Sequence, residues 1–327
     1  MEASKTDDGS VSPSSESARF IAGLESGDLA TLRRVPKADL HVHAYLGGCR
    51  AHIRARTGQD IPPLQGVLGS MDEMHAWNEA YVGPVFKAPG RRALPFEATF
   101  VQCVRDGVAR IDMGLDVAVV AREWATPADA WTWLKDIHRR EAPAVDWLPQ
   151  LGASRGSRPE KVEAWAEPLL ELGTFRTFDL YGDELARPVE AFKGVYRRAK
   201  AAGLILKCHV GEWGAADDVV RAVEVLELDE VQHGIAAAES SAAMRFLADA
   251  GVRLNLCPTS NLKLGRVKRI EEHPIRRLYD AGVRVTVNSD DPLMFGSDLS
   301  EEFLLLFEAQ VMSAVELDLI RRAALSD

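Results

Sequence analysis

The sequence has little cysteine, and the cysteines it has are widely spaced. Cys49, Cys103, Cys208 and Cys257 are the four cysteines among 327 residues, and they form no Cys-x-x-Cys pair. This spacing argues against a structural zinc knuckle and is typical of proteins from a reducing compartment. We therefore expect a cytoplasmic protein.

The sequence also lacks an excess of positive charge and long apolar runs. Lys and Arg number 39 against 49 Asp and Glu, which gives a formal net charge of -10 and argues against nucleic acid or a membrane surface as partner. No apolar run approaches the roughly 20 residues of a membrane span. Residues 1–17 are polar and contain no apolar signal-peptide core, so we predict a disordered leader there.

A glycine-rich Gly-x-Gly-x-x-Gly motif after the first strand is absent, which leaves a dinucleotide-binding fold without support. Instead, apolar strand-like segments alternate with helical ones. They are predicted at 35–43, 107–116, 145–153, 175–180, 204–210, 230–235, 252–257 and 283–288. Roughly eight β-then-α units predict a (β/α)8 TIM barrel in one domain at 18–327. An open, doubly wound sheet is the alternative.

A long insertion separates the first strand from the others. Residues 47–100 lose the strand-helix alternation and carry short helical pieces between proline and glycine pairs. The insertion contains large side chains, among them Met71, Met74, Trp77, Tyr81 and Phe86. An insertion of this length and composition predicts a helical lid over a substrate. A packed peripheral subdomain is the alternative.

Histidines and carboxylates stand at the two ends of this series of strands. His41 and His43 are two residues apart on the first strand, so they share a face and are well spaced to bind one ion. Two hydrogen-bonded histidines are the alternative. Asp290 and Asp291 follow the last strand, where they repel each other unless a cation or a proton lies between them. A solvated turn would be the simpler explanation.

Further polar residues follow the middle strands. In a barrel the C-terminal ends of the strands meet at one mouth, where catalytic residues gather. Three histidines and one aspartate at these ends would form a nitrogen-rich site suited to one zinc ion, with room for a water molecule. These four residues are His41, His43, His209 and Asp290.

The residues around this site suggest roles in hydrolysis. Zinc lowers the pKa of a bound water molecule to about 7. His233 and Asp290 are candidates to orient that water and take its proton, although a buried histidine can equally bond to the backbone. Glu212 is placed to protonate a substrate nitrogen, or alternatively to face a helix N-terminus. Gly182 would let a backbone N–H approach a flat ligand.

With these residues in place, the sequence resembles the adenosine deaminase family of the amidohydrolase superfamily. The resemblance extends from Val35 to the last helix and is most specific in the C-terminal third. The segments that carry it are 36–43, 179–184, 209–212, 233–234, 256–261, 273–275 and 288–293.

The resemblance implies a function and a role for each site residue. It implies hydrolytic deamination of a 6-aminopurine nucleoside to the 6-oxopurine and ammonia, with one zinc ion bound by the four residues named above. Glu212 would protonate the purine N1, while His233 and Asp290 would position the attacking hydroxide. Asp291 would bind the purine N7, and the Gly182 N–H the purine N3.

The sequence departs from the family pattern where the substrate's ribose would bind. Adenosine deaminases usually carry an acidic residue two positions after the second histidine, resembling a contact to the 5′-hydroxyl, whereas this chain has Tyr45. The second strand, 109–114, also lacks the family's Arg/Glu signature, and the chain ends soon after a helix from Leu299. Since Tyr45 offers no carboxylate, we predict a preference for 5′-modified adenosines, of the aminodeoxyfutalosine or methylthioadenosine type.

Two other functions compete with this interpretation. A two-metal amidohydrolase would use a carboxylated lysine at the end of the fourth strand, but residues 179–183 contain no lysine. A catalytically inactive nucleoside-binding protein would have lost a ligand or the proton donor, and this chain keeps them. Cytidine-type zinc deaminases carry a Pro-Cys-x-x-Cys motif, whereas Cys257 precedes Pro258 here. The oligomeric state is left open by the sequence.

Overall fold

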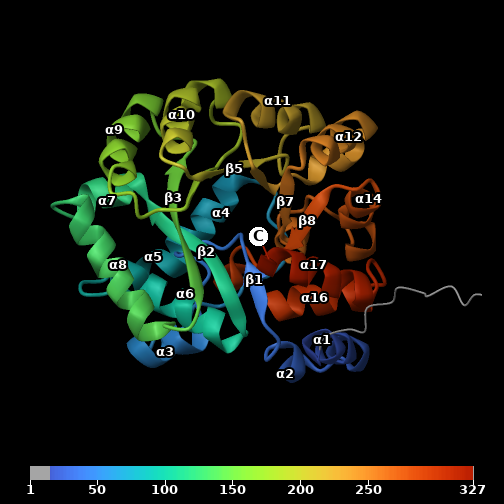
Figure 1. Ribbon diagram of the computed structural model, residues 1–327. Coiled ribbons are helices and arrows are strands. Elements are labelled where there is room, and N and C mark those ends of the chain that lie inside the picture. The colour runs from blue at the N-terminus through green and yellow to red at the C-terminus, as the bar shows by residue number, and fades with distance from the viewer. Residues whose placement is uncertain (1–14, 327) are drawn as a thin grey trace, which may run out of the picture.

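A computed structural model describes residues 15–326 of the chain. Its eight strands are all parallel and lie side by side in chain order in one sheet (Figure 1). The strands are β1 (Lys37–Asp39), β2 (Val108–Asp116), β3 (Asp146–Ser154), β4 (Thr177–Tyr181), β5 (Ile205–Val210), β6 (Glu230–His233), β7 (Arg253–Leu256) and β8 (Arg284–Val287).

The sheet curls until its first and last strands meet. An isolated parallel bridge joins Val42 to Asp290, and the Asp290 N–H donates to the His41 carbonyl at 2.9 Å. The Leu40 N–H donates to Asn288 Oδ1 at 2.8 Å. These contacts nearly close a (β/α)8 barrel, which confirms the predicted fold class. The first strand is shorter than the predicted 35–43, because the backbone beyond Asp39 meets the last strand only at isolated points.

Helices cover the outside of the barrel, as expected for an all-parallel sheet that must bury both faces (Figure 1). Among residues 15–326, no helix is both long enough and apolar enough to cross a membrane. The helices from β2 onward, with η denoting a 3₁₀ turn, are α7 (Val117–Glu123), α8 (Pro127–Glu141), α9 (Pro159–Leu170), η2 (Val189–Phe192), α10 (Lys193–Ala201), α11 (Ala216–Leu226), η3 (Ile235–Glu239), α12 (Ser241–Ala250), α13 (Pro258–Lys263), η4 (Ile270–Glu272), α14 (Ile275–Asp280), α15 (Pro292–Phe295), α16 (Leu299–Glu308) and α17 (Ala314–Ser326).

Two short helices precede the barrel, α1 (Ser15–Ser26) and α2 (Leu29–Leu32). They separate at Gly27, whose φ of 66° suits glycine, and Asp28 caps α2 by accepting from the Thr31 N–H. Residues 15–17 of the predicted leader belong to α1, and Ser17 is buried. The rest of the predicted leader lies outside the described residues.

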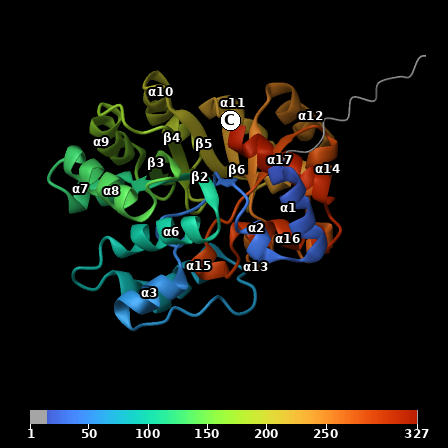
Figure 2. The same ribbon diagram turned by 60° about the horizontal axis from the view of Figure 1, so that its bottom comes forward.

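The insertion after β1 is helical, as predicted. It contains α3 (Arg50–Thr57), α4 (Met71–Trp77), the π-helix η1 (Asn78–Val82), α5 (Gly83–Phe86) and α6 (Leu94–Arg105). Its apolar residues form a second hydrophobic cluster with Leu293 and Phe295 of α15, separate from the main core. Figure 2 shows α3 at the end of the barrel opposite the C-terminus. The role of this insertion as a lid remains a prediction.

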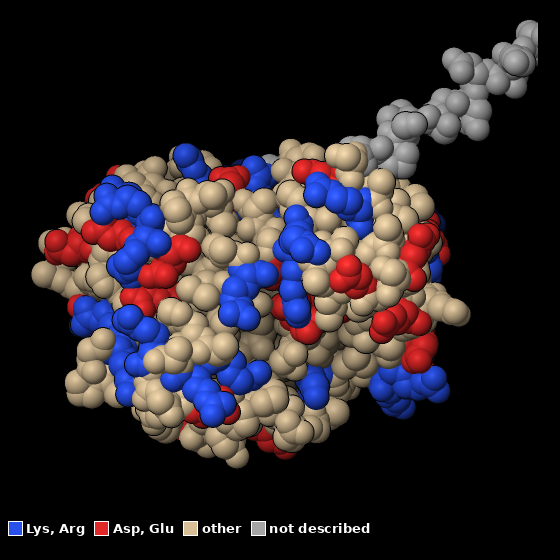
Figure 3. Space-filling view, turned by 90° about the horizontal axis from the view of Figure 1, so that it is seen from below, with Lys and Arg blue, Asp and Glu red and all other residues tan. Residues whose placement is uncertain are grey.

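Charged side chains are mixed on the face of the molecule drawn in Figure 3. Groups of Lys and Arg lie across the middle and lower part of this face, and Asp and Glu lie mainly toward its left and right sides. Ion pairs of the molecule include Arg276 with Glu316 at 2.8 Å and Arg92 with Glu123 at 3.0 Å.

Candidate active site

Four predicted ligands converge where β1, β5 and β8 end. His209 Nε2 lies 3.1 Å from His41 Nε2 and 3.3 Å from His43 Nε2. Asp290 Oδ1 lies 3.6 Å from His41 Nε2 and 3.3 Å from His43 Nε2. Ligands about 2.0–2.1 Å from a tetrahedral zinc ion stand roughly 3.3 Å apart. The spacings of these atoms are therefore compatible with ligands that share one metal ion.

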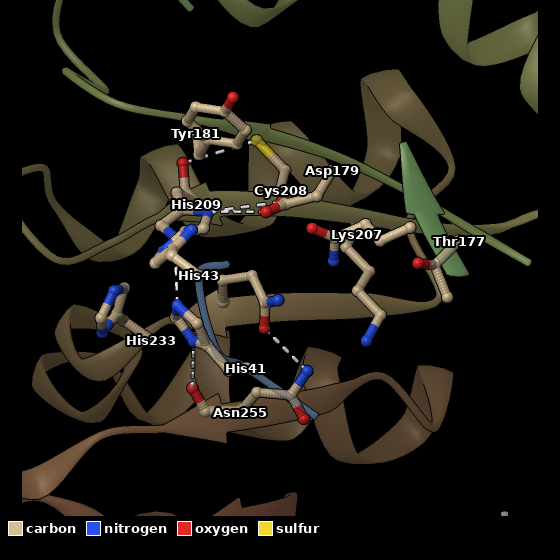
Figure 4. A network of polar contacts seen from close by, with 12 residues as sticks. His41, His43, Thr177, Asp179, Tyr181, Lys207, Cys208, His209, His233 and Asn255 are labelled. Atoms are coloured by element: carbon tan, nitrogen blue, oxygen red, sulfur yellow. Dashed lines mark hydrogen bonds and ion pairs between the residues drawn. The ribbon is translucent and has the colours of Figure 1, made fainter. Parts of the chain in front are cut away.

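The outer ring nitrogens of two of these histidines are held by other groups. His209 Nδ1 lies 3.1 Å from an Asp179 carboxylate oxygen, and His41 Nδ1 lies 3.3 Å from the Asn255 carbonyl oxygen (Figure 4). Because both partners are acceptors, each Nδ1 carries a proton, and the lone pair of each Nε2 faces the other ligands. Metal-binding histidines are commonly oriented in this way.

The charges around these ligands favour a cation. Burial alone would lower the pKa of His43, but Asp291 and Asp290 raise it to about 9. Burial would raise the pKa of Asp290, but His41 and its neighbouring histidines hold it below its usual value. The Asp290 carboxylate therefore stabilises positive charge between the rings, and this is the charge that a metal ion supplies.

Two site residues adopt a left-handed backbone that non-glycine residues seldom adopt. The φ angle is 63° at His233 and 58° at Asp290. Such a conformation costs on the order of 1–3 kcal/mol and is concentrated at functional sites. It directs His233 into the site, where its Nε2 lies 3.9 Å from Asp290 Oδ2. The structure thus places His233 beside the ligands, at the position predicted for a residue that orients water.

Glu212 lies just past the end of β5 and is buried, with Oε1 lacking any hydrogen-bond partner. Burial, followed by the negative charges of Asp290 and Glu184, raises the pKa of Glu212 well above its usual value. This shift favours the protonated form of the carboxyl group. This protonation state is the one a general acid needs, and burial in an apolar setting is a common way to obtain it.

The other predicted substrate contacts line the same cavity as Glu212. Asp291 is buried with Oδ1 unpartnered, and burial followed by Asp290 raises its pKa well above the usual value. Gly182 follows β4 and has a φ of 85°, which favours glycine. Both residues line the cavity next to the proposed ligands, and their contacts with a substrate remain a prediction.

The cavity has a volume of about 710 Å³, within the range of small-molecule sites. One wall comes from the insertion, through residues such as Met71, Met74 and Phe86. Trp77 and Tyr81, predicted to cover this pocket, are absent from its lining; Tyr81 is 46% exposed and its ring lies against Trp77 instead. The insertion therefore supplies apolar surface, but not through the two aromatics that we expected.

Tyr45 lines this cavity and packs edge-to-face against Phe86, with ring centroids 5.1 Å apart. The lining of the cavity also includes two carboxylates, Asp116 and Glu123, that the sequence did not indicate. Asp116 accepts from the Tyr181 hydroxyl and caps α7, while Glu123 is paired with Arg92. Both carboxylates are thus engaged within the protein.

Several supporting residues escaped prediction from the sequence. Asp179, which contacts His209 Nδ1, lies in segment 179–184 of the family resemblance, but the sequence predicted no role for it. Asn261 and His273 form a hydrogen-bonded pair behind His233, with the Asn261 amide 3.4 Å from His233 Nδ1. In the sequence, each of these residues is a polar residue close to apolar ones. Such a pattern is compatible with a buried side chain, but it does not tell which group the side chain contacts.

Comparison with known proteins identifies the family. The model of the family described as adenosine deaminase matches residues 157–326. A Treponema pallidum (strain Nichols) protein, provisionally named adenosine/adenine deaminase, is 36% identical over 270 residues, covering 83% of this chain and 90% of that protein. The chain belongs to the adenosine deaminase family. Its members are hydrolytic deaminases that act on C–N bonds, and this chain is such an enzyme.

Two further comparisons give lower sequence identity over most of the chain. Aminodeoxyfutalosine deaminase of Acidothermus cellulolyticus is 28% identical over 309 residues, covering 85% of this chain and 84% of that protein. The crystal structure of adenine deaminase from Arthrobacter aurescens aligns with a TM-score of 0.74 at 23% identity, covering 88% of this chain and 93% of that one. The latter similarity confirms the barrel fold.

Proposed function

We propose that this enzyme uses one zinc ion to deaminate a 6-aminopurine nucleoside, giving the 6-oxopurine and ammonia. One observation carries the proposal: the ring nitrogens of three histidines lie within 4.8 Å of one another next to Asp290, and two carboxyl oxygens without a partner among the described residues, on Glu212 and Asp291, belong to the lining of the adjoining cavity. A metal site alone would fit many hydrolases. The unpartnered oxygens add complementarity to a ligand that offers hydrogen-bonding nitrogens.

The zinc ion would be bound by three histidines and one aspartate, His41, His43, His209 and Asp290. Zinc supplies an activated water molecule, because it lowers the pKa of that water to about 7. Imidazole nitrogens with one carboxylate oxygen form a ligand set that suits zinc. His233 and Asp290 would orient the attacking water, since they border the metal site and stand side by side.

Glu212 would act as the general acid. Attack at C6 of the purine places negative charge on the ring, and protonation of N1 neutralises it. The raised pKa of Glu212 favours the protonated form that this role requires, and its Oε1 has no other partner among the described residues. Proton transfer by a positioned group typically contributes about 10²–10⁴-fold to the rate.

The remaining purine nitrogens would be recognised by Asp291 and Gly182. A protonated Asp291 would donate a hydrogen bond to N7, which accepts only, and its raised pKa supports that state. The Gly182 N–H would donate to N3. Because every ring nitrogen is then paired, a ring lacking one of them leaves a buried group unpaired and binds less well.

We further propose a preference for a 5′-modified nucleoside. The cavity, at about 710 Å³, has room beyond a purine ring, and Tyr45, Met74 and Phe86 give its wall an apolar character. Tyr45 occupies the position where the family usually has an acidic residue for the ribose. The similarity to aminodeoxyfutalosine deaminase supports the same substrate class. The insertion would act as a lid over this part of the substrate.

Adenine itself is the second candidate substrate. The Treponema pallidum relative is named for both adenine and adenosine, and the Arthrobacter aurescens structure is of an adenine deaminase. Adenine would satisfy Glu212 and Asp291 but would leave the Tyr45 side of the cavity without a contact.

Ammonia release from a panel of substrates separates these proposals. We expect kcat/KM to be highest for a 5′-thioether or other 5′-extended adenosine, lower for 5′-deoxyadenosine and adenosine, and lowest for adenine. An advantage of tenfold or more for adenosine, about 1.4 kcal/mol of transition-state binding, would overturn the preference inferred from Tyr45. If kcat/KM is instead tenfold or more higher for adenine, the proposed substrate is the free base and not a nucleoside.

A further inference from the structure

Asn261 connects two buried histidines that come from distant parts of the chain. Its amide nitrogen lies 3.4 Å from His233 Nδ1, and its amide oxygen lies 3.2 Å from His273 Nε2. All three side chains are at most 2% exposed. Each hydrogen bond must therefore be satisfied inside the protein, and the direction of donation is fixed by the partners.

The contacts of His273 show which group donates in each of these hydrogen bonds. The Ile275 backbone N–H donates to His273 Nδ1 at 3.2 Å, so this ring nitrogen is an acceptor and carries no proton. Burial lowers the pKa of His273 to about 3, so its ring is neutral near pH 7. The proton of the neutral ring must then be on Nε2, which donates to the Asn261 amide oxygen.

The Asn261 amide cannot turn over without losing this bond. Its backbone is also fixed, because its N–H donates to the Cys257 carbonyl at 3.0 Å, and its carbonyl accepts from the N–H groups of Arg266 and Val267. With the oxygen directed at His273, the NH₂ group must face His233. A donor there requires that His233 Nδ1 be the unprotonated nitrogen.

We propose that Asn261, oriented by His273, is a positioning residue that fixes His233 in the tautomer protonated on Nε2. This inference rests on the proposed function only for its catalytic consequence. In this tautomer His233 presents an N–H to Asp290 Oδ2 and to the reacting centre, and so acts there as a hydrogen-bond donor. The proton released by the attacking water then passes to Asp290.

The same tautomer protects the acid on the other side of the ring. His233 Nδ1 lies 3.6 Å from Glu212 Oε1. The opposite tautomer would direct an N–H at this oxygen, and a hydrogen bond to a carboxylate favours its charged form. With Nδ1 held as an acceptor by Asn261, His233 offers Glu212 no donor that would favour its charged form.

Nitrogen-15 NMR of histidine-labelled, zinc-loaded protein tests the tautomer directly. Protonated and unprotonated ring nitrogens have well-separated shifts, and a His233→Gln variant identifies the His233 signals. We expect an unprotonated Nδ1 and a protonated Nε2 in the wild type. His138 is the internal control, because its Nε2 lies 3.0 Å from the Val145 carbonyl and must carry the proton. A proton on His233 Nδ1 would overturn the proposal, whatever the substrate proves to be.

Asn261→Asp replaces the donor by an acceptor while it still accepts from His273. We expect His233 to become protonated on Nδ1 and kcat to fall by about 10²-fold or more, with a smaller change in KM. If His233 keeps the same tautomer in Asn261→Asp, the proposal is wrong. If the tautomer of His233 inverts but kcat is unchanged, the proposed catalytic consequence is wrong. If this variant fails to fold, the NMR spectrum of the wild type still tests the predicted tautomer of His233. The same spectrum tests it even if the enzyme proves not to deaminate a purine.

Discussion

The barrel holds two buried polar clusters, and they differ in how completely their groups are paired. The inner cluster consists of Asp112, Lys207, Glu230 and Arg253. Lys207 Nζ lies 2.5 Å from Asp112 Oδ2 and 2.8 Å from Glu230 Oε2, and Arg253 is bonded to Glu230. Burial would lower the pKa of Lys207, but its two carboxylate partners raise it, so the charges stay in place.

The site cluster consists of the four proposed metal ligands with Glu212 and Asp291. Here two carboxyl oxygens lack partners, and the histidine nitrogens face each other instead of facing donors. Lys207 and His209 are two residues apart on β5 and belong to different clusters (Figure 4). Since unpaired buried groups are costly, the comparison teaches that the carboxylates facing Lys207 stabilise the fold, whereas the unpartnered oxygens of Glu212 and Asp291, next to the proposed metal ligands, are available to a substrate.

Removing a metal ligand should have the largest effect. We expect about one zinc ion per wild-type chain, and His209→Ala should lose the zinc and with it all measurable deamination. His75→Ala is the matched control, since His75 lines the cavity away from the metal ligands and should keep the zinc. Metal analysis of protein purified without added metal provides the measurement. Two zinc ions per chain, or full activity with none, would contradict the mononuclear site.

Glu212→Gln should have the next largest effect. The amide cannot supply the acidic proton, so kcat should fall by about 10²–10⁴-fold while zinc content and substrate binding remain. Steady-state kinetics and binding by calorimetry give the two readouts. Glu123→Gln changes another carboxylate of the cavity lining, one that is already paired with Arg92, and its kcat should fall far less. Equal losses in the two variants would remove the special role of Glu212.

Lys207→Met should damage the inner cluster. It leaves Asp112 and Glu230 without their cation, and breaking a buried ion pair in this way costs about 3–5 kcal/mol of unfolding free energy. Denaturant unfolding of zinc-loaded protein measures the change. The control is Lys200→Met, because Lys200 forms its ion pair with Glu227 at the exposed surface and should contribute little. Equal stability of the two variants would show that the inner cluster does not support the fold.

The pH dependence of stability that His273 contributes should be the smallest effect of the four. The folded pKa of His273, lowered by burial to about 3, lies below its ordinary 6.5, so the unfolded chain binds the extra proton. This contribution to stability is complete above about pH 6.5 and is lost as pH falls towards 3. His273→Leu should reduce the slope of unfolding free energy against pH between 6 and 4 by about 1.4 kcal/mol per unit. An unchanged slope would show that His273 is already charged in the fold.

Most of the barrel could be predicted, because its strands carry their own signal. The segment ending at Val287, for example, alternates apolar and polar residues, and its predicted bounds of 283–288 lie within one residue of β8. The first strand was predicted too long. His41 and His43 continue its alternating pattern, but their backbone no longer pairs regularly with a neighbour, which is a property of the closed barrel and not of the local sequence.

The sequence by itself determined which residues share a face and which follow a strand, because both depend on covalent geometry along a few residues. In this way it indicated His41 with His43, and Asp290 with Asp291. Only the tertiary structure decided that His41 and His209, 168 positions apart, bring their Nε2 atoms to 3.1 Å. It also decided that Asn261 lies between two histidines, and that Glu212 Oε1 has no partner. The reason is that distances between distant segments, and the pairing of buried atoms, are set only when the barrel closes.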